Sequence, residues 1–286
     1  MTLRVSSVTK TYGTGDGARD AISDVSLEVA PREFVSIVGP SGCGKSTLLM
    51  IMAGLLKASR GTVSLDDRVV NGPPTGLSVV FQDYSRSLFP WMTVGKNVAM
   101  ALQPSRRPRR EVRRRVEHAL DSVGLAGSAG LYPWQMSGGM QQRAALARAL
   151  VVSPEVMLMD EPFAAVDAQT RIDLEDLVLR MRDEYGVTIV LVTHDIDEAV
   201  YVGDRVLVMA AKPGRIIADV EVDLGPDRDQ VATKMTSRYA ELRRQVFELV
   251  MRKGARPAPA APAVPPTPAE PEAAPARDEE PAALDA

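Results

Sequence analysis

An α/β fold with a largely parallel sheet is predicted for this chain of 286 residues, and two observations carry the prediction. The first is a glycine-rich turn at residues 39–47, which separates a short apolar run at 34–38 from a longer apolar segment at 48–56. The short run is typical of a buried strand, and the length of the second segment favours a buried helix. The second observation is that apolar runs and helical patterns alternate in the second half of the chain, which indicates crossover connections between parallel strands.

The individual elements follow from local composition. Runs of β-branched and apolar residues between turn residues predict strands, at residues 3–9, 21–29, 34–38, 61–65, 77–81, 156–159, 187–193, 206–210 and 216–222. Apolar patterns between Pro and Gly breakers predict helices, at residues 48–56, 93–102, 111–123, 137–152, 167–185 and 196–202, with a terminal pair of helices within 227–252. The last two strands are expected to close the sheet.

Charge and cysteine content exclude several classes of protein. The formal net charge is −3, but six acids and two arginines lie in residues 254–286, which leaves the rest of the chain close to neutral. This balance does not predict a nucleic-acid binder, and the arginines of 106–115 are more typical of a solvated helix face. The single cysteine, Cys43, permits no internal disulfide and fits a reducing compartment. The first ten residues lack the apolar core of a signal peptide, and no apolar run approaches the ~20 residues of a membrane helix.

The C-terminal segment differs from the rest of the chain. Residues 254–286 hold nine of the 21 prolines and are also rich in Ala and acids. Such a segment buries too little apolar surface to offset its ordering entropy, which predicts a disordered tail. A proline-rich docking motif is the alternative.

The turn at 39–47 has the pattern G-x-x-x-x-G-K-[ST] between a strand and a helix, which is the phosphate-binding P-loop. Its glycines let backbone N–H groups point at phosphate oxygens, and the helix N-terminus adds a positive dipole end. Lys45 is expected to reach the β- and γ-phosphates, and the Ser46 hydroxyl is expected to bind magnesium. The alternative is a glycine-rich turn in which Lys and Ser follow by chance. That alternative does not explain why a strand precedes the turn and a helix follows it. We expect nucleotide binding along the whole turn, at Gly39, Pro40, Ser41, Gly42, Cys43, Gly44, Lys45, Ser46 and Thr47.

Two further motifs fit a phosphate chemistry. The strand at 156–159 ends in Asp160 and Glu161. Beside a P-loop, the first acid at such a strand end holds magnesium, and a second one can polarise the attacking water; alone, the pattern is common. Ser137 is a natural N-cap, and Gly138 and Gly139 behind it expose N–H groups at the positive end of a helix dipole. A plain capped helix would avoid paired glycines, which cost about 1 kcal/mol each, so we expect a second phosphate site there.

In this order, the P-loop, the Ser-Gly-Gly turn and the Asp-Glu strand end resemble the nucleotide-binding subunit of an ABC transporter, over about residues 3–250. The resemblance implies a P-loop NTPase fold with a RecA-like parallel-sheet core, an N-terminal antiparallel β-subdomain and an inserted helical subdomain at about 84–152. The ATPase domain would cover residues 1–253. The resemblance also implies ATP and Mg²⁺ as cofactors and a homodimer of ATPase subunits. Each ATP would then lie between the P-loop of one subunit and the Ser-Gly-Gly turn of the other.

The resemblance also assigns roles to single residues. Gln82 matches the glutamine that senses magnesium and water, and His194 matches the switch histidine at the γ-phosphate. Asp167 matches an aspartate of the dimer interface, and Tyr12 matches the aromatic residue that stacks on adenine. From the residues alone, His194 fits a core histidine, Tyr12 could pack on the β-subdomain, and Gln82 carries no meaning. The implied catalytic set is Lys45, Gln82, Glu161 and His194, and the implied magnesium ligands are Ser46, Gln82 and Asp160.

Three segments indicate one branch of the ABC transporter family. Residues 132–135, 87–94 and 162–171 are similar to ATPases of the nitrate/sulfonate/taurine importer family. These segments do not identify which of the three solutes is transported. The similarity implies a separate transmembrane permease, which would contact this chain at residues 83–95. It also implies a periplasmic or extracellular solute-binding protein as an indirect partner. The expected location is peripheral, at the cytoplasmic face of the cell membrane, with no nucleic-acid partner.

Two alternatives stay open from the sequence. A non-transport ABC ATPase that acts on nucleic acid usually separates its motifs by a long coiled coil, whereas only short helices are expected between Gln82 and Ser137. The alternative of a regulator that binds nucleotide without hydrolysis is opposed by four intact residues, Lys45, Asp160, Glu161 and His194. A phosphate-release assay separates this second alternative from an ATPase.

Overall fold

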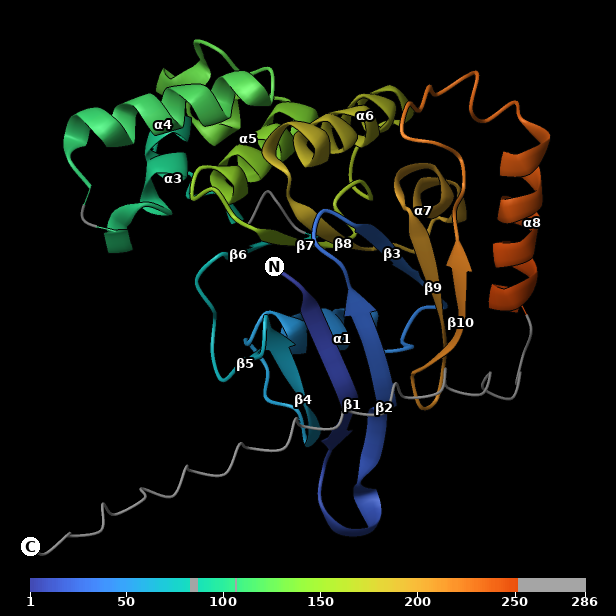
Figure 1. Cartoon of the computed structure of the whole chain (residues 1–286). Coiled ribbons are helices and arrows are strands. Elements are labelled where there is room, and N and C mark those ends of the chain that lie inside the picture. The colour runs from blue at the N-terminus through green and yellow to red at the C-terminus, as the bar shows by residue number, and fades with distance from the viewer. Residues whose placement is uncertain (83–86, 106, 252–286) are drawn as a thin grey trace, which may run out of the picture.

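The computed structural model describes residues 1–82, 87–105 and 107–251. A six-stranded sheet, with strand order β10-β9-β3-β8-β7-β6, forms the centre of the fold (Figure 1). The strands from β9 to β6 are parallel, and β10 pairs antiparallel with β9 at one edge. The predicted parallel sheet and its closing strands are therefore confirmed. The six strands are β3 (Phe34–Val38), β6 (Leu77–Val80), β7 (Val156–Asp160), β8 (Thr188–Val192), β9 (Arg205–Ala210) and β10 (Arg215–Glu221).

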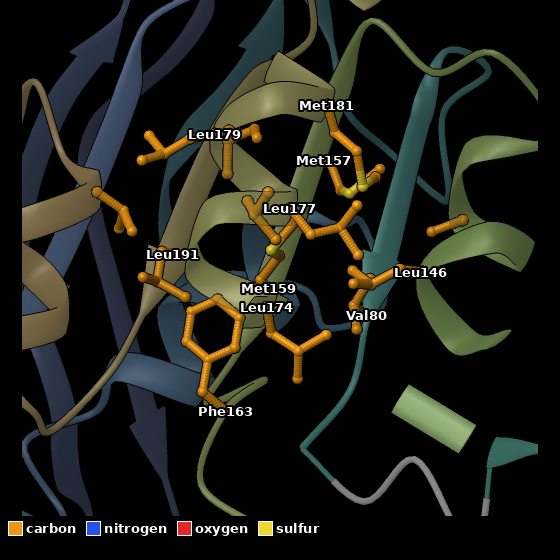
Figure 2. Packing of buried hydrophobic residues seen from close by; sticks show 14 of the residues in the cluster. Val80, Leu146, Met157, Met159, Phe163, Leu174, Leu177, Leu179, Met181 and Leu191 are labelled. Atoms are coloured by element: carbon orange, nitrogen blue, oxygen red, sulfur yellow. The ribbon is translucent and has the colours of Figure 1, made fainter. Parts of the chain in front are cut away.

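The central strands β3, β7 and β8 are buried on both faces, which explains why they are continuous apolar runs rather than alternating ones. In β7, Met157 and Met159 belong to a core shared with the helices, whereas Val156 and Leu158 belong to a second core on the opposite face. Figure 2 shows Met157 and Met159 packed with side chains of the helices that cover the first face.

A four-stranded antiparallel sheet and one helix cover the second face (Figure 1). The strand order is β2-β1-β4-β5. Three of the strands were predicted; the two-residue β5 was not, because a pair of residues leaves no periodic pattern in a sequence. The elements are β1 (Leu3–Tyr12), β2 (Arg19–Val29), β4 (Arg60–Leu65), β5 (Arg68–Val69) and the helix α1 (Lys45–Met52).

The remaining helices lie on the first face of the six-stranded sheet and at its β10 edge. Their apolar stripes follow helical spacing: in α6, Leu174, Leu177, Val178 and Met181 are all buried in the helical core. These helices are α3 (Val94–Met100), α4 (Arg109–Ser122), α5 (Gly138–Leu150), α6 (Ala168–Tyr185), α7 (Ile196–Val202) and α8 (Ser237–Met251). Short 3₁₀ turns lie at Gly15–Gly17, Gln103–Ser105, Ser128–Gly130 and Pro133–Gln135.

The predicted terminal pair of helices is wrong. One helix, α8, lies in the described part of residues 227–252, and turns precede it. Side chains compete with the helical ladder there: the Asp229 backbone N–H donates to Thr233 Oγ1 at 2.9 Å, and Thr236 Oγ1 donates to the Thr233 carbonyl at 2.7 Å. The predicted disordered tail, 254–286, lies outside the described residues.

None of the helices in the described ranges is long and apolar enough to cross a membrane.

Candidate active site

The P-loop connects β3 to α1, at the carboxyl end of the parallel strands. Gly44 is the N-cap of α1 and has a left-handed backbone with φ +95°. A Cβ at Gly44 would lie 2.4 Å from Ile22 Cγ2 of β2, so a side chain would meet both strain and a clash. The turn therefore fits only glycine at this position, and the first N–H groups of α1 stay free to face an anion.

Lys45 bends back over the turn. Its Nζ donates to the Gly39 carbonyl at 2.8 Å, and the side chain is almost fully buried. A buried ammonium needs acceptors, and carbonyl oxygens supply only part of its demand. Lys45 is thus held where its charge adds to the N-terminal dipole of α1, as expected for a phosphate site. The Cys43 thiol is buried in the core beneath, where burial raises its pKa.

Ser46 faces the end of β7. Its hydroxyl donates to Asp160 Oδ1 at 3.0 Å, which joins residues that are far apart in the sequence. Burial raises the pKa of Asp160, and the Ser46 hydrogen bond only partly opposes this effect. A cation beside the carboxylate would offset its desolvation. The structure therefore brings these two predicted magnesium ligands together.

Glu161, Gln82 and His194 form the second group of the site. Gln82 Nε2 donates to Glu161 Oε2 at 3.0 Å, and His194 Nδ1 lies 3.2 Å from the same oxygen. These residues follow β6, β7 and β8, whose carboxyl ends meet at one edge of the sheet. The His194 side chain is 59% exposed, so the structure does not support the alternative of a core histidine.

The Glu161 backbone is in a sparsely populated conformation, with φ +45° for a residue that is not glycine. Its N–H donates to the Val192 carbonyl at 2.8 Å, so the next strand of the sheet holds this conformation. Non-glycine residues with positive φ persist where surrounding structure fixes them, often at functional sites. The strain is consistent with a carboxylate that must point in one direction.

The Ser-Gly-Gly turn begins α5. The Met140 N–H donates to Ser137 Oγ at 3.3 Å, so Ser137 is the expected N-cap. In the described ranges, no hydrogen bond or ion pair joins Ser137, Gly138 or Gly139 to the P-loop. A Cβ at Gly139 would lie 2.4 Å from Thr170 Cγ2 of α6, which gives this glycine a packing role that the sequence did not reveal.

Asp167 and Tyr12 lie at the margins of the site. Asp167 is the N-cap of α6: it accepts from the Thr170 N–H at 3.0 Å and from Thr170 Oγ1 at 2.7 Å, and these bonds lower its pKa. Tyr12 ends β1 and is half exposed, on the hairpin whose Ile22 packs against Gly44. Lys10 Nζ lies over the Tyr12 ring, 5.3 Å from its centroid.

A family model described as ABC transporter matches residues 22–164, which is half of the chain. The chain belongs to the ABC transporter family. It is 46% identical to an aliphatic sulfonates import ATP-binding protein of Burkholderia cenocepacia, over 79% of this chain and 82% of the relative. It is 43% identical to the nitrate import ATP-binding protein NrtC of Synechococcus elongatus, over 84% of this chain and 36% of that longer protein.

Solved structures agree with this assignment. A dimeric ATP-binding cassette in a post-hydrolysis state with ADP and phosphate is 34% identical, with a TM-score of 0.67, over 77% of this chain and 98% of the other. The predicted P-loop NTPase fold is confirmed, and the chain is an ABC-type ATPase that binds ATP.

The residues of this ABC ATPase also fit a magnesium ion. Mg²⁺ keeps several waters and binds one or two protein oxygens together with substrate phosphates. Asp160 and Ser46 supply such oxygens, within hydrogen-bond distance of each other. The described ranges hold no group of three or more His, Cys, Asp or Glu side chains that could bind a metal by themselves, so substrate oxygens and water would complete the coordination.

Gly214, between β9 and β10, is a residue of this site that the sequence did not reveal. A Cβ there would lie 1.9 Å from the Cys43 carbonyl oxygen, so the glycine permits close contact with the P-loop. In the sequence it resembles any turn glycine after a proline. Only the tertiary structure shows that it touches residues 39–47.

Gly214→Ala is expected to weaken ATP binding about tenfold or more, because overpacking of 1–3 kcal/mol at the turn must displace the P-loop. The measurement is titration calorimetry with ATP. Gly72→Ala is the matched control, since a Cβ at Gly72 would meet no atom within 4 Å. Equal affinity of the two variants would show that the P-loop does not depend on Gly214.

Proposed function

We propose that this ATPase energises the uptake of a small solute, of the nitrate, sulfonate or taurine type, through a separate membrane permease. The cluster of Ser46, Asp160, Gln82, Glu161 and His194 at one edge of the sheet supports ATP hydrolysis. The import function is supported by the relatives described above, which are named for nitrate and aliphatic sulfonate import. The solute-binding protein and the permease are further parts of the proposal.

In the proposed mechanism, Lys45 and the P-loop amides bind the phosphates, and Tyr12 stacks on adenine. Ser46, Asp160 and Gln82 would hold Mg²⁺, which would supply charge neutralisation at the phosphate oxygens. Glu161 orients and polarises a water molecule in line with the γ-phosphate. His194, 3.2 Å from Glu161, contacts the γ-phosphate and keeps the carboxylate aligned.

A head-to-tail dimer completes the site in this proposal. The start of α5 makes no bond to the P-loop of its own chain in the described ranges, and Asp167 caps a helix near the chain surface. The N–H groups behind Ser137 of the partner subunit would therefore bind the triphosphate from the side opposite to Lys45. Closure on ATP and release after hydrolysis would move the permease between its two states.

The proposed permease contact is the aromatic segment that follows Gln82. Within it, residues 83–86 lie outside the described residues. Phe89 and Trp91 are in contact, with ring centroids 5.3 Å apart, and Trp91 is 69% exposed. Exposed aromatic rings are typical of the centre of protein interfaces. Contact with a permease would place this subunit at the cytoplasmic face of the membrane.

The proposed function is tested by reconstitution. The chain is purified with the permease that it binds, placed in liposomes with ATP inside, and given labelled nitrate, taurine or an alkanesulfonate outside with the matching solute-binding protein. We expect one of these solutes to accumulate only with hydrolysable ATP. Hydrolysis without accumulation of any of them would contradict the importer branch, while leaving the ATPase assignment in place.

Removal of the C-terminal tail is expected to leave ATP hydrolysis within about twofold of the full chain, since the elements that carry the site lie within the described residues, which end with α8. Tyr239, Leu242 and Val246 of α8 are buried, whereas the residues on which the site depends, up to Gly214, all precede α8. A chain ending at Lys253 is compared by phosphate release and thermal melting with one that ends before α8. The longer truncation should lower the melting temperature, because burial of each large apolar side chain contributes about 1.5–3 kcal/mol. A large loss of activity on removing 254–286 alone would show that the tail takes part in turnover.

A further inference from the structure

The turn that carries His194 is held by residues outside the proposed catalytic set. This turn joins β8 to α7. The Thr193 N–H donates to the Ile37 carbonyl at 3.1 Å, and Thr193 Oγ1 donates to Glu198 Oε2 at 2.6 Å. On the other side of the histidine, Asp195 accepts from the Asp197 and Glu198 N–H groups, at 2.8 and 3.2 Å. Both neighbours of His194 are therefore fixed by hydrogen bonds to α7.

Glu198 is the centre of this arrangement. It is 4% exposed, and burial raises its pKa to about 7. Its Oε1 lies 3.5 Å from Arg171 Nε of α6, and the same guanidinium lies 3.5 Å from Asp195 Oδ2. Arg171 Nε is itself buried and has no hydrogen-bond partner within the described ranges, so the ion pair with Glu198 compensates its burial. Arg171 thus pairs with Asp195, the N-cap of α7, and with Glu198 on α7, the two acids that fix the turn from both sides.

Arg171 also connects this turn to the first turn of α6. Its backbone N–H donates to the Asp167 carbonyl at 2.9 Å, one helical turn before it. His194, in contrast, is exposed, and its contact in the described ranges is with Glu161 Oε2 at 3.2 Å. An exposed imidazole keeps a single orientation only if its backbone is fixed. The position of His194 therefore depends on Arg171 and Glu198.

We propose that Arg171 and Glu198 are positioning residues that hold the His194 imidazole against Glu161. This inference rests on the proposed role of His194 in ATP hydrolysis. Thr193 and Asp195 transmit the effect: loss of the Glu198 charge releases Arg171 and weakens the Thr193 hydrogen bond. The imidazole then samples orientations away from Glu161. Turnover falls because the γ-phosphate contact is lost for part of the time, whereas the P-loop and ATP binding are not touched.

The test uses the fact that the chain has two histidines. The other, His118, lies on α4 beside the Tyr185 hydroxyl at 3.3 Å, so imidazole ¹H–¹⁵N spectra of His-labelled protein contain an internal reference. In Glu198→Gln we expect the His194 ring signals to shift or broaden, while those of His118 stay in place. We also expect kcat to fall about tenfold and KM for ATP to stay within about twofold, as for an interaction used only in turnover.

Glu175→Gln is the matched control. Glu175 is a buried carboxylate of α6 whose pKa is also raised by burial, and it accepts from Gln230 Nε2 at 3.0 Å and from Lys234 Nζ at 3.4 Å. It acts on the His194 turn through its charge alone, which adds to the causes that raise the pKa of Glu198. It should lower the melting temperature to a similar extent and leave the His194 signals and kcat unchanged. If Glu198→Gln does not fold, Arg171→Gln, with a side chain 33% exposed, replaces it with the same expected results.

Unchanged His194 signals in a folded Glu198→Gln or Arg171→Gln protein would overturn the positioning role. Equal effects of Glu175→Gln and Glu198→Gln on the His194 signals would overturn it too, since a general loss of stability would then be the cause. The catalytic role of His194 is tested by a separate variant. Normal turnover of a His194→Ala protein would contradict that role, whereas the spectra of the Glu198→Gln protein would still show whether Glu198 positions the His194 ring.

Discussion

Glu161→Gln should retain ATP binding and lower ATP hydrolysis by about a hundredfold or more, the usual contribution of a general base. The amide keeps an oxygen that can accept from Gln82, which now donates to Glu161 at 3.0 Å, so the geometry of the site should survive. The amide cannot take a proton from water and carries no charge to polarise it. Binding and chemistry should therefore separate in this variant, as measured by calorimetry for ATP and phosphate release for turnover.

Because closure on ATP is proposed to precede hydrolysis, the same variant should accumulate as an ATP-bound dimer in size-exclusion chromatography. The control is Glu155→Gln, at the other end of β7, where the carboxylate is 55% exposed and pairs with the chain N-terminus at 3.6 Å. That variant should hydrolyse ATP at the normal rate and elute as the unmodified protein does. Brisk hydrolysis by Glu161→Gln would remove Glu161 from the proposed catalytic set.

Much of the fold could be predicted because its signals are local and strong. The central parallel strands are buried on both faces, so they appear as apolar runs, and the P-loop is recognised from nine consecutive residues. The same reasoning placed Asp160 and Glu161 at a strand end, where Ser46 and His194 meet them in the structure. Parallel strands bring their carboxyl ends to one edge of a sheet, so the assembly follows from topology.

The remaining features depend on tertiary contacts that leave no local signal. Gly214 and Gly139 look like a turn glycine and a helix-start glycine, and only the folded chain shows what a Cβ would meet at each. The terminal segment before α8 has helical composition, yet hydroxyl and carboxylate side chains compete for its backbone groups. Arg171 and Glu198 are ordinary charged residues in the sequence, and their significance arises when α6 and α7 pack together.

The sequence also predicted two phosphate sites in one chain, and a mixing experiment decides whether partner subunits share them. Ser137→Asp keeps a good N-cap but places a negative charge beside the phosphates, and Lys45→Ala removes the ammonium of the P-loop. In a head-to-tail dimer, each variant alone has two defective sites. A mixed dimer concentrates both changes in one site and leaves the other intact. Random mixing yields mixed dimers for half of the population, so about a quarter of the wild-type activity should return.

The reciprocal mixture is the control. When the wild-type chain is mixed with a chain that carries both changes, every mixed dimer has one defect in each shared site, and about a quarter of the activity should remain. Sites that each belong to a single chain predict the opposite results, which are no recovery in the first mixture and about half of the activity in the second. The two mixtures contain the same substitutions in equal amounts, so differences in folding or stability cannot imitate the pattern. Only a triphosphate bound between Lys45 of one subunit and Ser137 of the partner subunit produces it.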